Sequence, residues 1–217
     1  MAEILGGKSE NFSRVRSIGK EVGEFMNFIS LRSIQNDKDY LYYKLAYLTA
    51  PTMAKKKPAT LLSFSHNNWD LYALWETYKV EIAEKLQLEY FEIRKCPKRI
   101  LVIFFNRPLL LKTLLKDCNR KYLMAAGYSG ELDLEEYLIL LKRRFATSCP
   151  HEVGIFLGIP LEDVLTFVEK EGKGCLLNSY WKVYHNPQKA RLIFASYDQA
   201  RAEVSKLHQM AAAAGKG

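Results

Sequence analysis

The residues of this chain best suited to chemistry fall in one stretch, residues 149–184. His151 and Glu152 stand side by side near its start, and an imidazole changes its charge near neutral pH. His151 is therefore a candidate ligand or general base. If a strand begins at residue 151, the two side chains point to opposite faces, because side chains alternate along a strand. The structural alternative is a histidine that caps the strand or is buried and hydrogen-bonded.

The end of this stretch, residues 180–184, reads Tyr-Trp-Lys-Val-Tyr. In a strand, Tyr180, Lys182 and Tyr184 would share one face, and Trp181 and Val183 the other. Two aromatic rings beside a lysine are the components of a platform on which a base can stack. The alternative is a strand with one face in the core and the other covered by a helix.

A second candidate segment surrounds Pro51. Thr49 and Thr52 offer hydroxyls there, and Lys55 and Lys57 offer positive charge. Proline disfavours helical geometry at the preceding residue and suits a first helical turn, so we expect a helix to break and restart here. A papain-like hydrolase places a reactive cysteine at such a helix start. Threonine cannot replace that thiolate without a strong base, so this interpretation predicts an inactive copy.

A metal site is not predicted. Cys149 and His151 would need two further ligands, and the nearest ones in sequence are Glu152, Cys175 and His185. Their spacing matches no metal-binding pattern. The four cysteines contain no Cys-x-x-Cys pair, which indicates free thiols in a reducing compartment. Since the chain also lacks a secretory signal and an apolar run of roughly 20 residues, we expect a cytoplasmic protein without a membrane span.

Length and composition predict one folded domain. The chain has 217 residues, of which 48% are hydrophobic and 12% aromatic, enough for a substantial core. We expect that domain over residues 1–210, with a disordered tail at 211–217. The net charge of +8 favours anionic partners, whether phosphorylated small molecules, acidic proteins or nucleic acid.

The hydrophobic pattern predicts an α+β fold with a mostly antiparallel sheet of about four strands, packed with several amphipathic helices. Helices are expected over residues 12–29, 37–49, 71–86, 108–115, 120–127, 133–145, 160–171 and 187–207. Strands are expected over residues 88–95, 99–105, 152–157 and 179–184. The first two form a hairpin, and residues 99–105 should be central in the sheet because both of their faces are apolar.

Several segments resemble a bacterial family of clostridia-type organisms known as domain of unknown function 3793. They are PHEVGIFLG at 150–158, PLEDV at 160–164, YWKVY at 180–184, APTMA at 50–54 and KPATL at 57–61. The resemblance covers about residues 45–200 and implies a shared fold and a shared pocket, not an activity. Members commonly carry a cysteine before Ala-Pro-Thr and a cysteine pair before Tyr-Trp-Lys-Val. This chain has Thr49 at the first place and Leu177-Asn178 near the second, which leaves any role of those cysteines in doubt here.

Together these observations predict a non-catalytic binder of an anionic small molecule or cofactor, with an iron- or haem-related ligand as one option. The ligand would lie between the segment at 50–52 and the strand at 151–158. The alternatives are a basic protein associated with nucleic acid and a degenerate enzyme of thiol-hydrolase ancestry. The candidate ligand-binding residues are Thr49, Thr52, Lys55, Lys57, His151, Glu152, Tyr180, Trp181 and Lys182.

Overall fold

The computed structural model describes residues 36–66, 70–128 and 132–214, so the helix expected at 12–29 lies outside the described residues. Its helices are α2 (Asp37–Met53), α3 (Leu71–Leu86), α4 (Arg107–Leu114), α5 (Asp117–Ala125), α6 (Leu134–Arg144), α7 (Val153–Phe156), α8 (Leu161–Glu169) and α9 (Pro187–Ala214). Its strands are β1 (Ala59–Ser65), β2 (Glu89–Cys96), β3 (Arg99–Phe105), β4 (Leu177–Asn178) and β5 (Lys182–Val183). The α+β class is as predicted.

The main sheet is antiparallel and has three strands in the order β1-β3-β2, instead of the four expected. The predicted hairpin is confirmed as β2 and β3, and β3 is central as its two apolar faces indicated. Strand β1 was not predicted. Neither 152–157 nor 179–184 belongs to this sheet.

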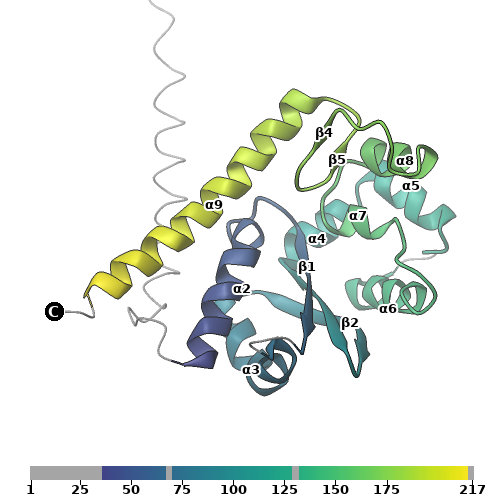
Figure 1. Ribbon diagram of the computed structural model, residues 1–217. Coiled ribbons are helices and arrows are strands. Elements are labelled where there is room, and N and C mark those ends of the chain that lie inside the picture. Colours follow the sequence, from purple (N-terminus) through teal and green to yellow (C-terminus); the bar gives the residue numbers. More distant parts are fainter. Residues whose placement is uncertain (1–35, 67–69, 129–131, 215–217) are drawn as a thin grey trace, which may run out of the picture.

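Helices cover both faces of the sheet (Figure 1). On one face, Ile100, Val102 and Phe104 of β3 pack in a core with residues of α2, α3 and α9. On the other face, Ile103 and Phe105 pack in a second core with residues of α4, α5, α6, α7 and α8. Because alternate side chains of a strand point to opposite faces, β3 contributes to both cores and had to be apolar throughout.

Helix α2 continues through Pro51, so the expected break and restart there is wrong. A proline inside a helix removes one backbone hydrogen bond. Here the helix persists because its buried residues pack against α3, α9 and the sheet. It ends at the turn after Met53, where Lys55 has a φ of 54°.

Residues 152–157 form the short helix α7 and its flanking turns, which corrects the predicted strand. The backbone N–H groups of Val153 and Ile155 donate to the carbonyls of Pro150 and Glu152. A short buried apolar run does not show by its pattern whether it is helix or strand. The absence of a side chain on Gly154 matters here, because a Cβ atom would lie 2.9 Å from Cγ2 of Val164 on α8.

The strand expected at 179–184 is also replaced, by a small hairpin of β4 and β5 with two residues in each strand. Two predicted caps are confirmed. Asp133 and Glu136 form a capping box at the start of α6, and the Asn186 side chain accepts from the N–H of Lys189 at the start of α9. Helix α9 runs to Ala214, so residues 211–214 of the expected tail are helical, and residues 215–217 lie outside the described residues.

Candidate functional site

The two candidate segments meet in space, but they do so through close packing. Gly158 has a φ of 79°, and a Cβ atom built on it would lie 2.5 Å from Cδ of Pro58. Next to this contact, Ala59, Ile155 and Phe156 are fully buried in the same core. Protein atoms therefore occupy the junction between the segments, where the sequence predicted that a ligand would lie.

Thr49 and Thr52 lie inside the protein, with 0% of each residue exposed. The Thr49 hydroxyl donates to the Leu45 carbonyl within α2 at 2.7 Å. The Thr52 hydroxyl is 2.7 Å from that of Thr60 on β1. Both hydroxyls are thus used to hold α2 together and to join it to the sheet, and neither faces solvent.

The side chain of His151 is exposed and that of Glu152 is buried, and both residues lie in a turn instead of the expected strand. Glu152 is 3% exposed and forms an ion pair with Arg144 of α6, and the Tyr128 hydroxyl donates to it at 3.3 Å. Burial, with the nearby Glu152 carboxylate, raises the pKa of the Tyr128 phenol. Glu152 therefore anchors the entry to α7, whereas His151 is exposed and its ring centroid lies 5.7 Å from that of Phe167.

Trp181 is hydrogen-bonded to Asp163, which belongs to the PLEDV segment at 160–164. Its indole Nε1 donates to Oδ2 of Asp163 at 2.8 Å. The other oxygen of this buried carboxylate accepts from the backbone N–H groups of Tyr184 and His185. Hydrogen bonds to a charged group are stronger than neutral ones. Asp163 therefore joins the PLEDV segment to the YWKVY segment, and Trp181 is not free to stack on a ligand.

Lys182 and His151 both lie near the Phe167 ring of α8. The Lys182 ammonium donates to the Gly172 carbonyl at 2.8 Å, close to the C-terminal end of this helix. It also lies 5.9 Å from the centroid of the Phe167 ring that His151 contacts. Lysine near a helix C-terminus is stabilising, which accounts for this placement without a ligand.

Lys57 and Tyr180 both lie near the Tyr197 ring of α9. The Lys57 ammonium lies 5.8 Å from the centroid of the Tyr197 ring, and the Tyr180 ring contacts Tyr197 edge to face at 5.0 Å. One turn further along α9, the Arg201 guanidinium lies 4.9 Å from the Tyr180 ring and 5.5 Å from that of Tyr47. We call these five residues the Lys57–Arg201 cluster.

The positive charges of this cluster are poorly compensated. Burial, with the nearby charge of Arg201, lowers the pKa of Lys57 to about 8. Among the residues that the structure describes, no carboxylate lies within ion-pair distance of Lys57. Within the same ranges, the buried Nε of Arg201 has no hydrogen-bond partner. An unsatisfied buried donor costs about 1 to 3 kcal/mol, so such a group calls for an explanation.

Two tyrosines of the cluster, Tyr180 and Tyr197, keep their protons. Burial raises the pKa of Tyr197 to about 12, and it raises that of Tyr180 to about 12 with the help of Asp198. The Tyr180 hydroxyl donates to the Asp198 carboxylate and accepts from Nη1 of Arg201 at 3.1 Å. Tyr180 and Tyr197 therefore offer the two cations neutral ring faces, and the Asp198 carboxylate is linked to Arg201 through the Tyr180 hydroxyl.

Arg201, Tyr47 and Tyr197 are the cluster residues absent from the sequence-based prediction. Two predicted cations lie outside the cluster: Lys55 is exposed in the turn after α2, and Lys182 lies beside α8. A signal for Arg201 was present. It stands four residues after Tyr197 in α9, so both occupy the same helix face. What the sequence did not reveal was that this face meets the turn containing Lys57.

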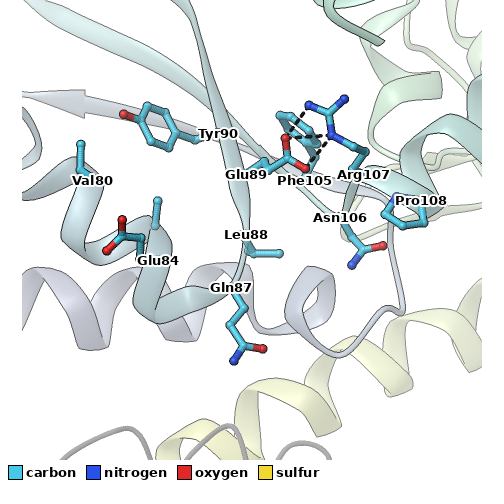
Figure 2. A pocket seen from close by; sticks show the side chains of 11 residues that line it. Val80, Glu84, Gln87, Leu88, Glu89, Tyr90, Phe105, Asn106, Arg107 and Pro108 are labelled. Carbon is cyan, nitrogen blue, oxygen red and sulfur yellow. Dashed lines mark hydrogen bonds and ion pairs between the residues drawn. The ribbon is translucent and has the colours of Figure 1, made fainter. Parts of the chain in front are cut away.

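A cavity of about 540 Å³ lies elsewhere, between the end of α3, the start of β2 and the start of α4. Figure 2 shows the Glu89 carboxylate facing the Arg107 guanidinium at its edge. Arg107 also forms an ion pair with Glu135 of α6, so its charge is already compensated. None of the nine predicted site residues lines this cavity.

Residues 36–66, 70–128 and 132–214 contain no group of three or more histidine, cysteine, aspartate or glutamate side chains placed to hold a metal ion. Over the same ranges, no helix has the length and apolarity required to cross a bilayer.

The fold and the site define an α+β protein with a three-stranded antiparallel sheet between helices and a cationic, tyrosine-rich cluster against α9. A family model described as "Protein of unknown function (DUF3793)" matches residues 45–214. The chain belongs to this family. No curated protein and no solved structure matches it significantly.

Proposed function

We propose that this protein binds an anionic small molecule or cofactor at the Lys57–Arg201 cluster. One observation carries the proposal: two cationic side chains share an aromatic environment that supplies no carboxylate to Lys57 and no hydrogen-bond acceptor to Nε of Arg201 among the described residues. A bound phosphate or carboxylate would supply a counter-charge to Lys57 and a hydrogen-bond acceptor to the guanidinium of Arg201. Arginine suits such groups, because its planar guanidinium can donate two parallel hydrogen bonds.

The rings of the cluster suggest the rest of the ligand. Tyr47, Tyr180 and Tyr197 line the surroundings of the two cations, and planar rings favour planar partners. An aromatic or conjugated anion fits this combination better than a small inorganic ion does. An iron- or haem-related ligand stays within this class, because the haem propionates are carboxylates. The proposed role is binding without chemical turnover.

We further place this function in the cytoplasm. All four cysteines are free thiols. Unpaired cysteines are usual where glutathione and thioredoxin keep thiols reduced. Cys96 is the thiol whose pKa is lowered, through hydrogen bonds from the backbone of Lys98 and Arg99, and a reducing compartment would protect it from oxidation.

Calorimetric titration with phenyl phosphate tests the binding proposal, with phenol as the neutral analogue. We expect phenyl phosphate to bind and phenol to bind at least about tenfold more weakly, since about 1.4 kcal/mol of charge interaction corresponds to that factor. Lys57→Met and Arg201→Gln should each weaken the binding of phenyl phosphate. Lys56→Met is the matched control, because Lys56 is the exposed neighbour of Lys57 and its replacement should leave binding unchanged.

Equal affinities in all three variants would contradict the proposal, and so would equal binding of phenol and phenyl phosphate. A native mass spectrum of the purified protein provides an independent measurement. We expect a copurified anionic molecule that the Lys57→Met variant retains less well. An absorbance spectrum and a metal analysis of the same sample decide between an iron- or haem-related ligand and an organic anion.

A further inference from the structure

The side chain of Lys57 is more buried than those of Lys55 and Lys56. The backbone N–H groups of Lys56 and Lys57 both donate to the Pro51 carbonyl, at 2.8 and 3.2 Å. The next residue, Pro58, packs against Gly158. Between these two fixed points the Lys57 side chain is half-buried and reaches the Tyr197 ring, whereas Lys55 and Lys56 are exposed. The chain thus presents one lysine of three to the aromatic cluster.

We propose that Lys57 forms a reversible covalent imine with the carbonyl group of a small anionic aldehyde or keto acid, and that Arg201 binds the carboxylate or phosphate of the same molecule. This inference rests on the proposed function and names its ligand class. Its geometric basis is an amine that lies over the Tyr197 ring and has no carboxylate within ion-pair distance among the described residues, with Arg201 on the neighbouring Tyr180 ring. Enzymes activate lysine in the same way, by desolvation and a neighbouring positive charge.

The chemistry requires only the ligand and water. The lone pair of the neutral amine attacks the carbonyl carbon, the C=O π bond breaks, and a proton passes from nitrogen to oxygen to give a carbinolamine. Loss of that hydroxyl as water forms the C=N bond. The reverse reaction with water releases the ligand. The lowered pKa of Lys57, about 8, supports this step because it leaves a larger share of neutral amine near neutral pH than an ordinary lysine has.

The test uses glyoxylate, the simplest aldehyde that carries a carboxylate, with cyanoborohydride to reduce the imine. Reduction transfers a hydride to the imine carbon and leaves a carboxymethyl group on the lysine, which mass spectrometry of peptides locates. In the full-length protein near neutral pH, we expect Lys57 to be modified at least about tenfold faster than Lys56 and Lys173, because more of its amine is neutral. Lys173 is a suitable comparison, since its side chain is 81% exposed.

Propionaldehyde, a neutral aldehyde of similar size, forms the second arm of the test. We expect Arg201→Gln to slow the modification of Lys57 by glyoxylate severalfold and to leave its modification by propionaldehyde nearly unchanged. Far-UV circular dichroism of this variant checks that it is folded. Equal labelling of Lys57, Lys56 and Lys173 by glyoxylate would overturn the inference.

An effect of Arg201→Gln that is the same for both aldehydes would also overturn the inference, since Arg201 would then not recognise the anion. The titration with phenyl phosphate separates the two proposals. If phenyl phosphate binds to the cluster but glyoxylate does not select Lys57, the covalent step fails and the binding function stands. If phenyl phosphate fails to bind and Lys57 reacts equally fast with both aldehydes, the binding function fails as well.

Discussion

At the scale of single residues, Lys57 is the side chain whose surroundings are most at odds with its charge. Its pKa is lowered to about 8 by burial and by Arg201, so the folded protein binds this proton less tightly than the unfolded chain does. Stability then rises with pH between the folded and the unfolded pKa, because the unfolded state holds more protons over that interval. A charged Lys57 therefore destabilises the folded protein at neutral pH.

Replacing Lys57 with methionine should stabilise the protein by about 1 to 3 kcal/mol at about pH 7, since one pKa unit corresponds to about 1.4 kcal/mol. The gain should shrink as the pH rises from about 8 towards about 10.5, where wild-type Lys57 becomes neutral in both states. Urea unfolding of both proteins across this range measures it. Lys56→Met should change stability little at any pH, and a pH-independent gain in Lys57→Met would contradict the explanation.

At the scale of elements, the contact between Gly158 and Pro58 joins the two segments that carry the family motifs. Glycine is needed at position 158 for two separate reasons, its φ of 79° and the 2.5 Å approach of Cδ of Pro58 to the place of a Cβ atom. The turn before β1 and the turn after α7 can meet only because no side chain intervenes. This contact helps to hold the Lys57 backbone in position.

Gly158→Ala should therefore destabilise the protein more than Gly174→Ala does. Gly174 has a similar φ of 69°, but no heavy atom lies within 4 Å of the place that a Cβ atom would occupy, so its substitution carries the conformational cost alone. That cost is about 1 kcal/mol, and the steric overlap at Gly158 should add about 1 to 3 kcal/mol. Chemical denaturation of the two variants measures the difference. Equal losses of stability would show that the Pro58 contact relaxes without cost.

At the scale of the whole molecule, β3 joins the two helical layers into one cooperative structure. Val102 packs in the core with α2, α3 and α9, and its neighbour Ile103 packs in the core on the opposite face. Both side chains are fully buried. Damage to either core therefore acts on a strand that the other core requires.

Val102→Ala and Ile103→Ala should each lower the unfolding free energy, by about 1 to 4 kcal/mol. In both variants, unfolding followed by far-UV circular dichroism should coincide with unfolding followed by tryptophan fluorescence, which reports on Trp75 and Trp181 among the described residues. Exposed Val80, which is 61% accessible, provides the control, and Val80→Ala should have little effect. Separate transitions for the two probes would show that the layers unfold independently.

Much of the local structure followed from the sequence because its causes are local. The capping residues Asp133 and Asn186 set the starts of α6 and α9, and the continuous apolar run of β3 predicted its central place. Local signals failed where packing decided the outcome. Pro51 argued for a break that burial of α2 prevents, and residues 153–156 form a helix although their apolar run fits either structure.

The sequence by itself determined the α+β class, the caps at Asp133 and Asn186, the β2–β3 hairpin and the residue types from which a site could be built. Only the tertiary structure decided which of those residues meet. It turned Thr49, Thr52, Glu152 and Trp181 towards structural partners, and it brought Lys57 to Arg201, which lies more than a hundred positions later in the chain. The reason is physical: a cap or a strand pattern acts over a few residues, whereas the surroundings of a charge depend on which distant surfaces pack together.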